Sequence, residues 1–270
     1  MNPTASSTYA AGDAAGYELQ MGRWSRRLAP GFVDFTEIEA ARRIIDVGCG
    51  TGHLSLALVR SPRVEHVTGI DLSTAYVEHA RSRSDDSRLE FVVGDACRLP
   101  FPDGWFDHSA SMLVLQFVPD ADAAVREMRR VTRRGGTVAA ATWDSRGGLV
   151  FLRVIVDTAA VVDPDADRLR AKLLSQPLTR PGDLRRCWGN AGLLDVTQDM
   201  LTVRMDFECF ADFWAPCEGQ EGPLAAYVGR LSTDDRTRLR ALVQRAYLDG
   251  EPDGPRSYAA TAWMVKGKVP

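Results

Sequence analysis

The run Ile44-Ile45-Asp46-Val47-Gly48-Cys49-Gly50-Thr51-Gly52-His53-Leu54 places three alternate glycines between an apolar segment and a helical repeat. Residues 43–47 have the composition of a short buried strand of a parallel sheet, whereas Leu54, Ala57 and Leu58 recur at helical spacing. The glycines therefore form a strand-to-helix turn. Because glycine tolerates positive φ and lets a ligand approach the main chain, the run predicts a loop that binds a nucleotide-containing cofactor.

The spacing of the glycines separates two kinds of cofactor. The dinucleotide fingerprint G-x-G-x-x-G/A has its third small residue one position later, where this chain has His53. The loop therefore departs from the NAD rule. It resembles instead motif I, D-x-G-x-G-x-G, of the class I S-adenosylmethionine-dependent methyltransferases, matched by Asp46, Gly48, Gly50 and Gly52.

Strands and helices alternate on both sides of this loop. We predict strands over 43–47, 66–71, 89–94, 106–113 and 137–143, helices over 53–60, 73–83 and 120–133, and a helix stop at 133–136. Such alternation implies parallel strands joined by right-handed crossovers. Later segments predict helices over 149–162, 165–174 and 181–191, a helical stretch over 210–247, and strands over 195–207 and 258–268.

The expected fold is α/β, a doubly wound, mostly parallel, seven-stranded Rossmann-like sheet with helical cap insertions. Its expected parts are a disordered tail over 1–16, two N-terminal lid helices over 17–42 with a break at Pro30-Gly31, a cofactor-binding core over 43–144, cap insertions over 145–180 and 208–256, and the remainder of the core sheet over 181–207 and 257–270.

Carboxylates follow the next two predicted strands. Asp71 lies about 20 residues past the glycine loop, the distance at which a carboxylate accepts both ribose hydroxyls, although an N-terminal helix cap is an alternative role for it. Gly94-Asp95-Ala96, followed by Leu99-Pro100-Phe101, resembles the adenine site of the same methyltransferases. That resemblance implies that Asp95 accepts from the exocyclic amine and that the Ala96 amide meets a ring nitrogen.

The resemblance is nearly continuous over 43–144 and also includes the segment Tyr17 to Ser25, which is similar to the lid helix of the ubiquinone/menaquinone-biosynthesis-like (methyltransferase type 11) branch. It implies S-adenosyl-L-methionine as cofactor and S-adenosyl-L-homocysteine as product. The cofactor residues expected on these grounds are Tyr17, Ser25, Asp46, Gly48, Cys49, Gly50, Gly52, Asp71, Leu72, Gly94, Asp95, Ala96, Met112 and Gln116. The substrate residues expected beyond the strand ends and in the cap are Gln116, Trp143, Phe151, Phe213 and Trp214.

The sequence names no catalytic residue. A general base is needed only where the acceptor is a hydroxyl or a carbon acid, and the candidates are His53 and Asp144. The cap aromatics could enclose a planar or apolar acceptor, although core packing is the more frequent reason for aromatic residues on helices. The expected function is direct in-line methyl transfer to a small, partly apolar metabolite, with an NAD-dependent oxidoreductase or a non-catalytic cofactor-binding protein as alternatives.

Composition limits the partners. A net charge of -3 and a pI of 5.9 give no field for holding polyanions, so nucleic acid is not expected, and the arginines of 126–134 are interpreted as a solvated helix face. The five cysteines show no metal-ligand spacing, which predicts a reduced, cytoplasmic protein without a metal. No signal peptide or membrane span is expected, and the acceptor and oligomeric state stay open.

Overall fold

The computed structural model describes residues 7–9, 11–38, 42–219 and 221–270. A seven-stranded sheet has the order β3-β2-β1-β4-β5-β7-β6, with β7 antiparallel to both of its neighbours and the other pairs parallel. The strands are β1 (Arg43–Val47), β2 (His66–Asp71), β3 (Leu89–Val93), β4 (Phe106–Met112), β5 (Thr132–Trp143), β6 (Leu194–Phe207) and β7 (Arg256–Lys268). The expected doubly wound, mostly parallel fold is confirmed.

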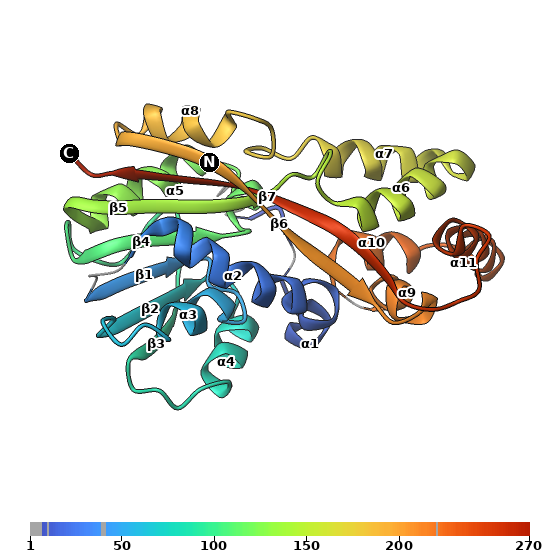
Figure 1. Ribbon diagram of the computed structural model, residues 1–270, viewed down its shortest axis with the longest axis horizontal. Coiled ribbons are helices and arrows are strands. Elements are labelled where there is room, and N and C mark those ends of the chain that lie inside the picture. Colours follow the sequence, from blue (N-terminus) through green and yellow to red (C-terminus); the bar gives the residue numbers. More distant parts are fainter. Residues whose placement is uncertain (1–6, 10, 39–41, 220) are drawn as a thin grey trace, which may run out of the picture.

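Helices cover both faces of this sheet (Figure 1). On one face α2 (Arg23–Thr36) and α3 (His53–Leu58) bury residues such as Trp24 and Leu28 against the strands. On the other face α5 (Ala121–Val131) and α8 (Asp183–Asn190) bury Met128 and Trp188, whose indole Nε1 donates to Val138 O at 2.9 Å. The α4 helix (Thr74–Ser82) packs near β2 and β3.

The remaining helices gather at one end of the sheet, where Figure 1 shows β6 and β7 running out to meet them. They are α6 (Val150–Val162), α7 (Pro164–Leu174), α9 (Phe210–Glu218), α10 (Gly222–Val228) and α11 (Thr233–Leu248). The two segments expected to form a cap contact each other, α6 with α11 and α7 with α10. The end of the parallel strands at which they gather is the carboxyl end, where ligands bind in such sheets.

The structure corrects three local predictions. The helix α2 is continuous, so no break occurs at Pro30. Pro30 lies on the exposed side of α2, whereas Trp24 and Phe32 on its other side are buried in the core. The α5 helix ends at Val131, and residues 132–136 belong to β5 rather than to a helix stop. The helical stretch expected over 210–247 is divided into α9, α10 and α11.

The expectation of a disordered tail over 1–16 is also wrong for the part that the structure describes. Asp13 caps a short helix, α1 (Ala14–Tyr17), which continues into the π-helix η1 (Glu18–Gly22). Thr8 N donates to Phe117 O at 2.8 Å, and the Tyr9 and Phe117 ring centroids are 5.0 Å apart. Contacts with residues distant in sequence hold this segment in place, and the composition of an Ala- and Ser-rich run does not predict such contacts. Residues 1–6 and 10 lie outside the described residues.

Candidate cofactor and acceptor site

The glycine loop leaves β1 between the carboxyl ends of β2 and β4, which is the point where the strand order reverses. Gly48 adopts φ 73°, and a Cβ there would lie 2.5 Å from the Val114 side chain. A Cβ on Gly50 would meet nothing within 4 Å, so its backbone faces open space. Gly52, at φ 89°, is the N-cap of α3. The first and third glycines therefore shape the turn, and the second exposes it to a ligand.

Asp71 connects the loop to the next helix. Its Oδ2 accepts from Gly50 N at 2.9 Å and its Oδ1 accepts from Ser73 N at 2.9 Å. Burial raises the pKa of the Asp71 carboxyl, against the effect of these two hydrogen bonds. Ser73, rather than Asp71, is the N-cap of α4, because its hydroxyl accepts from Tyr76 N. Asp71 therefore shapes the loop and stands beside Gly50, where the space that a side chain would occupy is open.

Asp95 follows β3 and accepts from Cys97 N at 2.8 Å, which holds a tight turn. Its side chain and those after β1 and β2 face one cavity, of about 350 Å³. Of the cofactor residues expected from sequence, every one but Gly52 lines this cavity. The structure thus brings together residues from the ends of four strands, β1 to β4, and from the lid.

The lid segment closes the cavity from above the loop. Tyr17 Oη lies 3.1 Å from Ser25 Oγ, and the Tyr17 ring packs against Tyr76 at 5.2 Å between centroids. Residues Ser7, Tyr9 and Gln20, which the sequence did not indicate, also line the cavity. Their role arises from the fold of the N-terminal segment.

Two carboxylates missed by sequence reasoning fasten this lid. Glu18 Oε1 accepts from Thr51 Oγ1 at 2.5 Å and lies 2.8 Å from His53 Nε2. Although burial opposes its ionisation, the contacts with His53 and Thr51 lower the pKa of Glu18 to about 2. Glu221, at the start of α10, accepts from Asp13 N at 2.9 Å and from Tyr76 Oη at 2.7 Å. The lid is thus tied both to the glycine loop and to the cap.

Two of the expected substrate residues are placed elsewhere. Trp143, Phe151 and Gln116 line the cavity, whereas Phe213 and Trp214 do not. Both side chains are at most 1% exposed and belong to an aromatic core with Phe207, Phe210, Tyr247 and Tyr258. The prediction for Phe213 and Trp214 is corrected, because helical spacing cannot distinguish the side of a cap helix that faces a ligand from the side that faces the core. Gly52 is likewise corrected to a turn-forming role.

Neither candidate base is free for catalysis. His53 lines the cavity but its ring is held by Glu18 and lies within 3.1 Å of Arg83 Nη1. Asp144 does not line the cavity, and its Oδ1 accepts from Arg146 N and Gly147 N at 3.2 and 3.0 Å. His53 therefore helps to hold the lid, and Asp144 holds a turn.

Asp46 is a buried carboxyl below the glycine loop. Its Oδ2 accepts from Ser55 Oγ at 2.7 Å, and burial raises its pKa from 3.8 to about 7. Because the pKa of Asp46 is higher in the folded than in the unfolded protein, the proton bound to Asp46 stabilises the fold. This stabilisation is complete below the unfolded pKa of 3.8 and is lost as the pH rises through about 7.

We expect a comparison with Asp46→Asn, whose side chain cannot ionise, to reveal this loss of stability in the wild type. The free energy of unfolding of the wild type should fall relative to the variant by roughly 1–3 kcal/mol between about pH 5 and about pH 8. Urea denaturation at the two pH values measures it. A constant difference between the two proteins would contradict a titrating buried Asp46.

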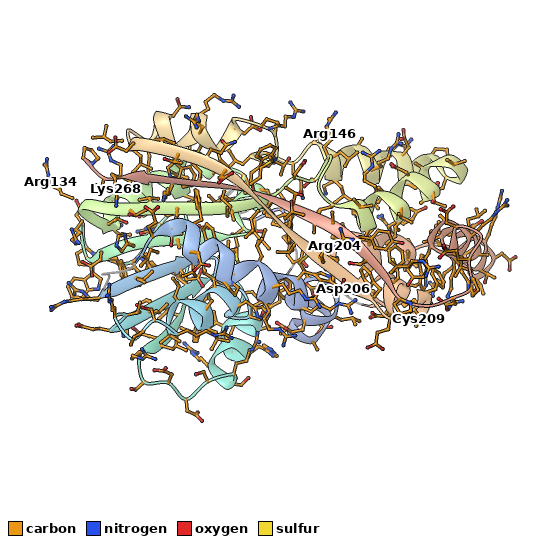
Figure 2. The ribbon with its side chains drawn as sticks, in the orientation of Figure 1. Arg134, Arg146, Arg204, Asp206, Cys209 and Lys268 are labelled. Carbon is orange, nitrogen blue, oxygen red and sulfur yellow. The ribbon has the colours of Figure 1, made fainter. Side chains whose placement is uncertain are left out.

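The arginines of 126–134 do not form one solvated helix face. Arg134 lies on β5, where Figure 2 shows its side chain pointing away from the sheet. On α5, Arg126 is exposed, whereas Arg130 is engaged in a network. Arg130 Nη2 donates to Leu99 O at 2.9 Å and Nη1 to Phe101 O at 2.8 Å, while Nε donates to Glu127 Oε1 at 2.7 Å. Glu127 Oε2 in turn accepts from Leu99 N at 2.9 Å. Arg130 and Glu127 together hold residues 99–101, which follow Asp95 in the chain.

Arg130→Leu should therefore weaken binding of S-adenosylhomocysteine by roughly ten-fold and lower the free energy of unfolding by about 1–3 kcal/mol, because Glu127 and two carbonyls lose their partner. Arg126→Leu is the matched control on the same helix, since its side chain lies 3.9 Å from the exposed Asp120. It should change either quantity by less than about 0.5 kcal/mol. Calorimetry and urea denaturation measure both, and equal effects of the two variants would contradict the role of Arg130.

Within the residues that the structure describes, no group of three His, Cys, Asp or Glu side chains could hold a metal ion. None of the described helices is long and apolar enough to cross a bilayer.

Residues 45–140 match the sequence family described as a methyltransferase domain. The 27-O-demethylrifamycin SV methyltransferase of Amycolatopsis mediterranei is 31% identical over 148 residues, which are 53% of this chain and 50% of that protein. The demethylmenaquinone methyltransferase of Listeria welshimeri is 35% identical over 106 residues, 38% of this chain and 45% of that protein. The chain spans about half the length of the curated relatives it matches.

Among solved structures, phosphoethanolamine N-methyltransferase 2 of Haemonchus contortus, in complex with phosphomonomethylethanolamine and S-adenosylhomocysteine, has a TM-score of 0.60 at 15% identity. The similarity covers 95% of this chain and 57% of that chain, and at this identity it shows the fold alone.

A doubly wound sheet with a glycine loop and carboxylates after successive strands defines a nucleotide-cofactor-binding α/β protein. Together with the matched methyltransferase domain over residues 45–140, it makes this part of the chain similar to the class I S-adenosylmethionine-dependent methyltransferases.

Proposed function

We propose that this protein transfers the methyl group of S-adenosylmethionine to a small, partly apolar metabolite by direct in-line displacement. The observation that carries the proposal is the single cavity that joins the glycine loop and Asp71 to the apolar side chains of the cap, such as Phe151 and Leu224. One enclosed space therefore offers room for the cofactor and for an acceptor next to it.

The residues present fit the cofactor. The open backbone at Gly50 admits a close approach, and the Asp71 carboxylate beside it would accept the ribose hydroxyls. Asp95 and the Ala96 amide would hold the adenine ring. Tyr17 and Ser25 would cover the cofactor from the lid.

The cofactor supplies a methyl group activated by a positively charged sulfur. The chain's own contribution is then alignment and exclusion of water, for which placement alone can lower the barrier by about 7–11 kcal/mol. The lid and the cap provide both, because Glu18 and Glu221 close the lid over the loop while Trp143 and Phe151 line the far side. No described side chain is required as a nucleophile.

Calorimetry with S-adenosylhomocysteine and with NADH tests the cofactor, and methyl transfer from labelled S-adenosylmethionine to a panel of phenols, amines and quinols tests the reaction. We expect binding of S-adenosylhomocysteine only, and labelled product with at least one acceptor. Tight NADH binding would favour the oxidoreductase alternative. Cofactor binding without transfer to any acceptor would favour a non-catalytic binding protein.

A further inference from the structure

The first described residues of the chain form a strap over the cavity, which consists of residues 7–9 and 11–13. The strap belongs to no helix or strand, and three of its residues line the cavity. Near one end, Thr8 N donates to the carbonyl of Phe117, which follows β4, at 2.8 Å. Further along, Ala11 O accepts from Oγ of Ser73, which follows β2, at 3.3 Å. The strap therefore crosses the strand ends at which the expected cofactor residues lie.

A single carboxylate of the cap, that of Glu221, holds the strap where it enters α1. Glu221 Oε2 accepts from Asp13 N at 2.9 Å and from Gly12 N at 3.4 Å, and Oε1 accepts from Tyr76 Oη at 2.7 Å. Glu221 is only 3% exposed, so its charge depends on these hydrogen bonds, and all three donors are neutral. Glu221 is thus a latch that joins the strap, α4 and the cap.

The carboxylate of Glu18, on η1, is fastened more strongly. It lies 2.8 Å from His53 Nε2 and accepts from the guanidinium of Arg83 at 3.3 Å. It also packs against its own helix, because a Cβ on Gly22 would lie 2.5 Å from Glu18 Cδ. Hydrogen bonds between two charged groups are stronger than those to neutral donors. The strap can therefore detach from the cap while η1 stays on the glycine loop.

We propose that the strap opens to exchange the cofactor, and that Glu221 is the positioning residue that sets how often it opens while η1 remains anchored. A ligand beneath the strap can leave past it only when this part of the lining moves, and the strap has no helix or strand hydrogen bonds to break. The inference rests on the proposed function, because it takes the cavity to hold S-adenosylmethionine.

The rate constants for S-adenosylhomocysteine, measured by surface plasmon resonance on immobilised protein, test this role. The latch is a contact within the protein, so Glu221→Ala destabilises the free and the bound closed states equally. It should raise the association and dissociation rate constants by about ten-fold each and change the dissociation constant by less than about three-fold. Glu221→Gln, which keeps one acceptor oxygen, should raise each rate constant by about three-fold.

Two further variants separate a latch from a general loss of structure. Glu208→Ala is the matched control, since Glu208 is an exposed carboxylate at the start of the cap, and it should leave both rate constants unchanged. Glu18→Ala loosens the glycine loop and should raise the dissociation rate constant alone. An unchanged association rate constant in Glu221→Ala, or faster association in Glu18→Ala, would overturn the assignment.

Hydrogen–deuterium exchange of the protein without ligand tests the latch independently of the cofactor. Glu221→Ala should speed amide exchange in a peptide covering residues 7–13 by about ten-fold and leave residues 18–22 unchanged. Exchange over 7–13 equal to that of the wild type would refute the latch. A wild type that binds no S-adenosylhomocysteine would refute the proposed function, and exchange would still decide whether Glu221 holds the strap. If Glu221→Ala does not fold, Glu221→Gln serves for both measurements.

Discussion

Replacing Asp71 by alanine should weaken binding of S-adenosylhomocysteine by about 30-fold or more, a loss of roughly 2–4 kcal/mol, and this is the largest expected effect on the cofactor. The reason is twofold. The carboxylate would accept the ribose hydroxyls, and it already accepts from Gly50 N and Ser73 N at 2.9 Å each. The substitution therefore removes a ligand contact and releases the backbone that the ligand rests against.

Calorimetry with S-adenosylhomocysteine measures the loss, and thermal unfolding of the same samples shows whether the loop change extends to the whole fold. Asp71→Asn keeps one acceptor oxygen and should lose less affinity than Asp71→Ala. Glu90→Ala is the matched carboxylate control, because Glu90 lies on β3 with its side chain 57% exposed. Unchanged affinity of Asp71→Ala would remove Asp71 from the binding site.

The largest expected loss of stability belongs to Phe213→Ala. Phe213 is fully buried, with ring centroids 5.1 Å from Phe207 and 5.0 Å from Tyr247. Truncation leaves a cavity among aromatic side chains, so the free energy of unfolding should fall by about 3–5 kcal/mol. The folded fraction should bind S-adenosylhomocysteine as the wild type does, because Phe213 does not line the cavity.

Urea denaturation measures this change, and Val161→Ala serves as its control because Val161 is 84% exposed on a cap helix. The control should shift the free energy of unfolding by less than about 0.5 kcal/mol. A Phe213→Ala protein that loses less than about 1 kcal/mol of stability would contradict the core role of Phe213.

Much of the cavity lining at the ends of β1, β2 and β3 was predictable because its residues act locally. The alternate glycines, Asp71 and Gly94-Asp95-Ala96 each follow a strand, and parallel strands bring their carboxyl ends to one edge. The strand boundaries for β1 and β2 agree with the prediction residue for residue. Pattern, spacing and chain direction together decide such a site.

The lid and the cap were predicted less well. Glu18 contacts Thr51, and Glu221 contacts Asp13, across separations that leave no trace in local periodicity. Phe151 and Phe213 are equally apolar and equally helical, yet the first lines the cavity and the second lies in the aromatic core. Which side of a cap helix faces the ligand depends on how the helices pack against one another.

The sequence alone determined the sheet, its direction, and the carboxylates and glycines that line the cavity, because alternating strand and helix patterns and turn-forming residues act over a few positions. Only the tertiary structure decided that the N-terminal segment closes over the loop, that Arg130 holds the chain after Asp95, and that Phe151 lines the cavity whereas Phe213 does not. These features arise from side chains distant in sequence that meet on folding, and burial then fixes which of their polar atoms have partners.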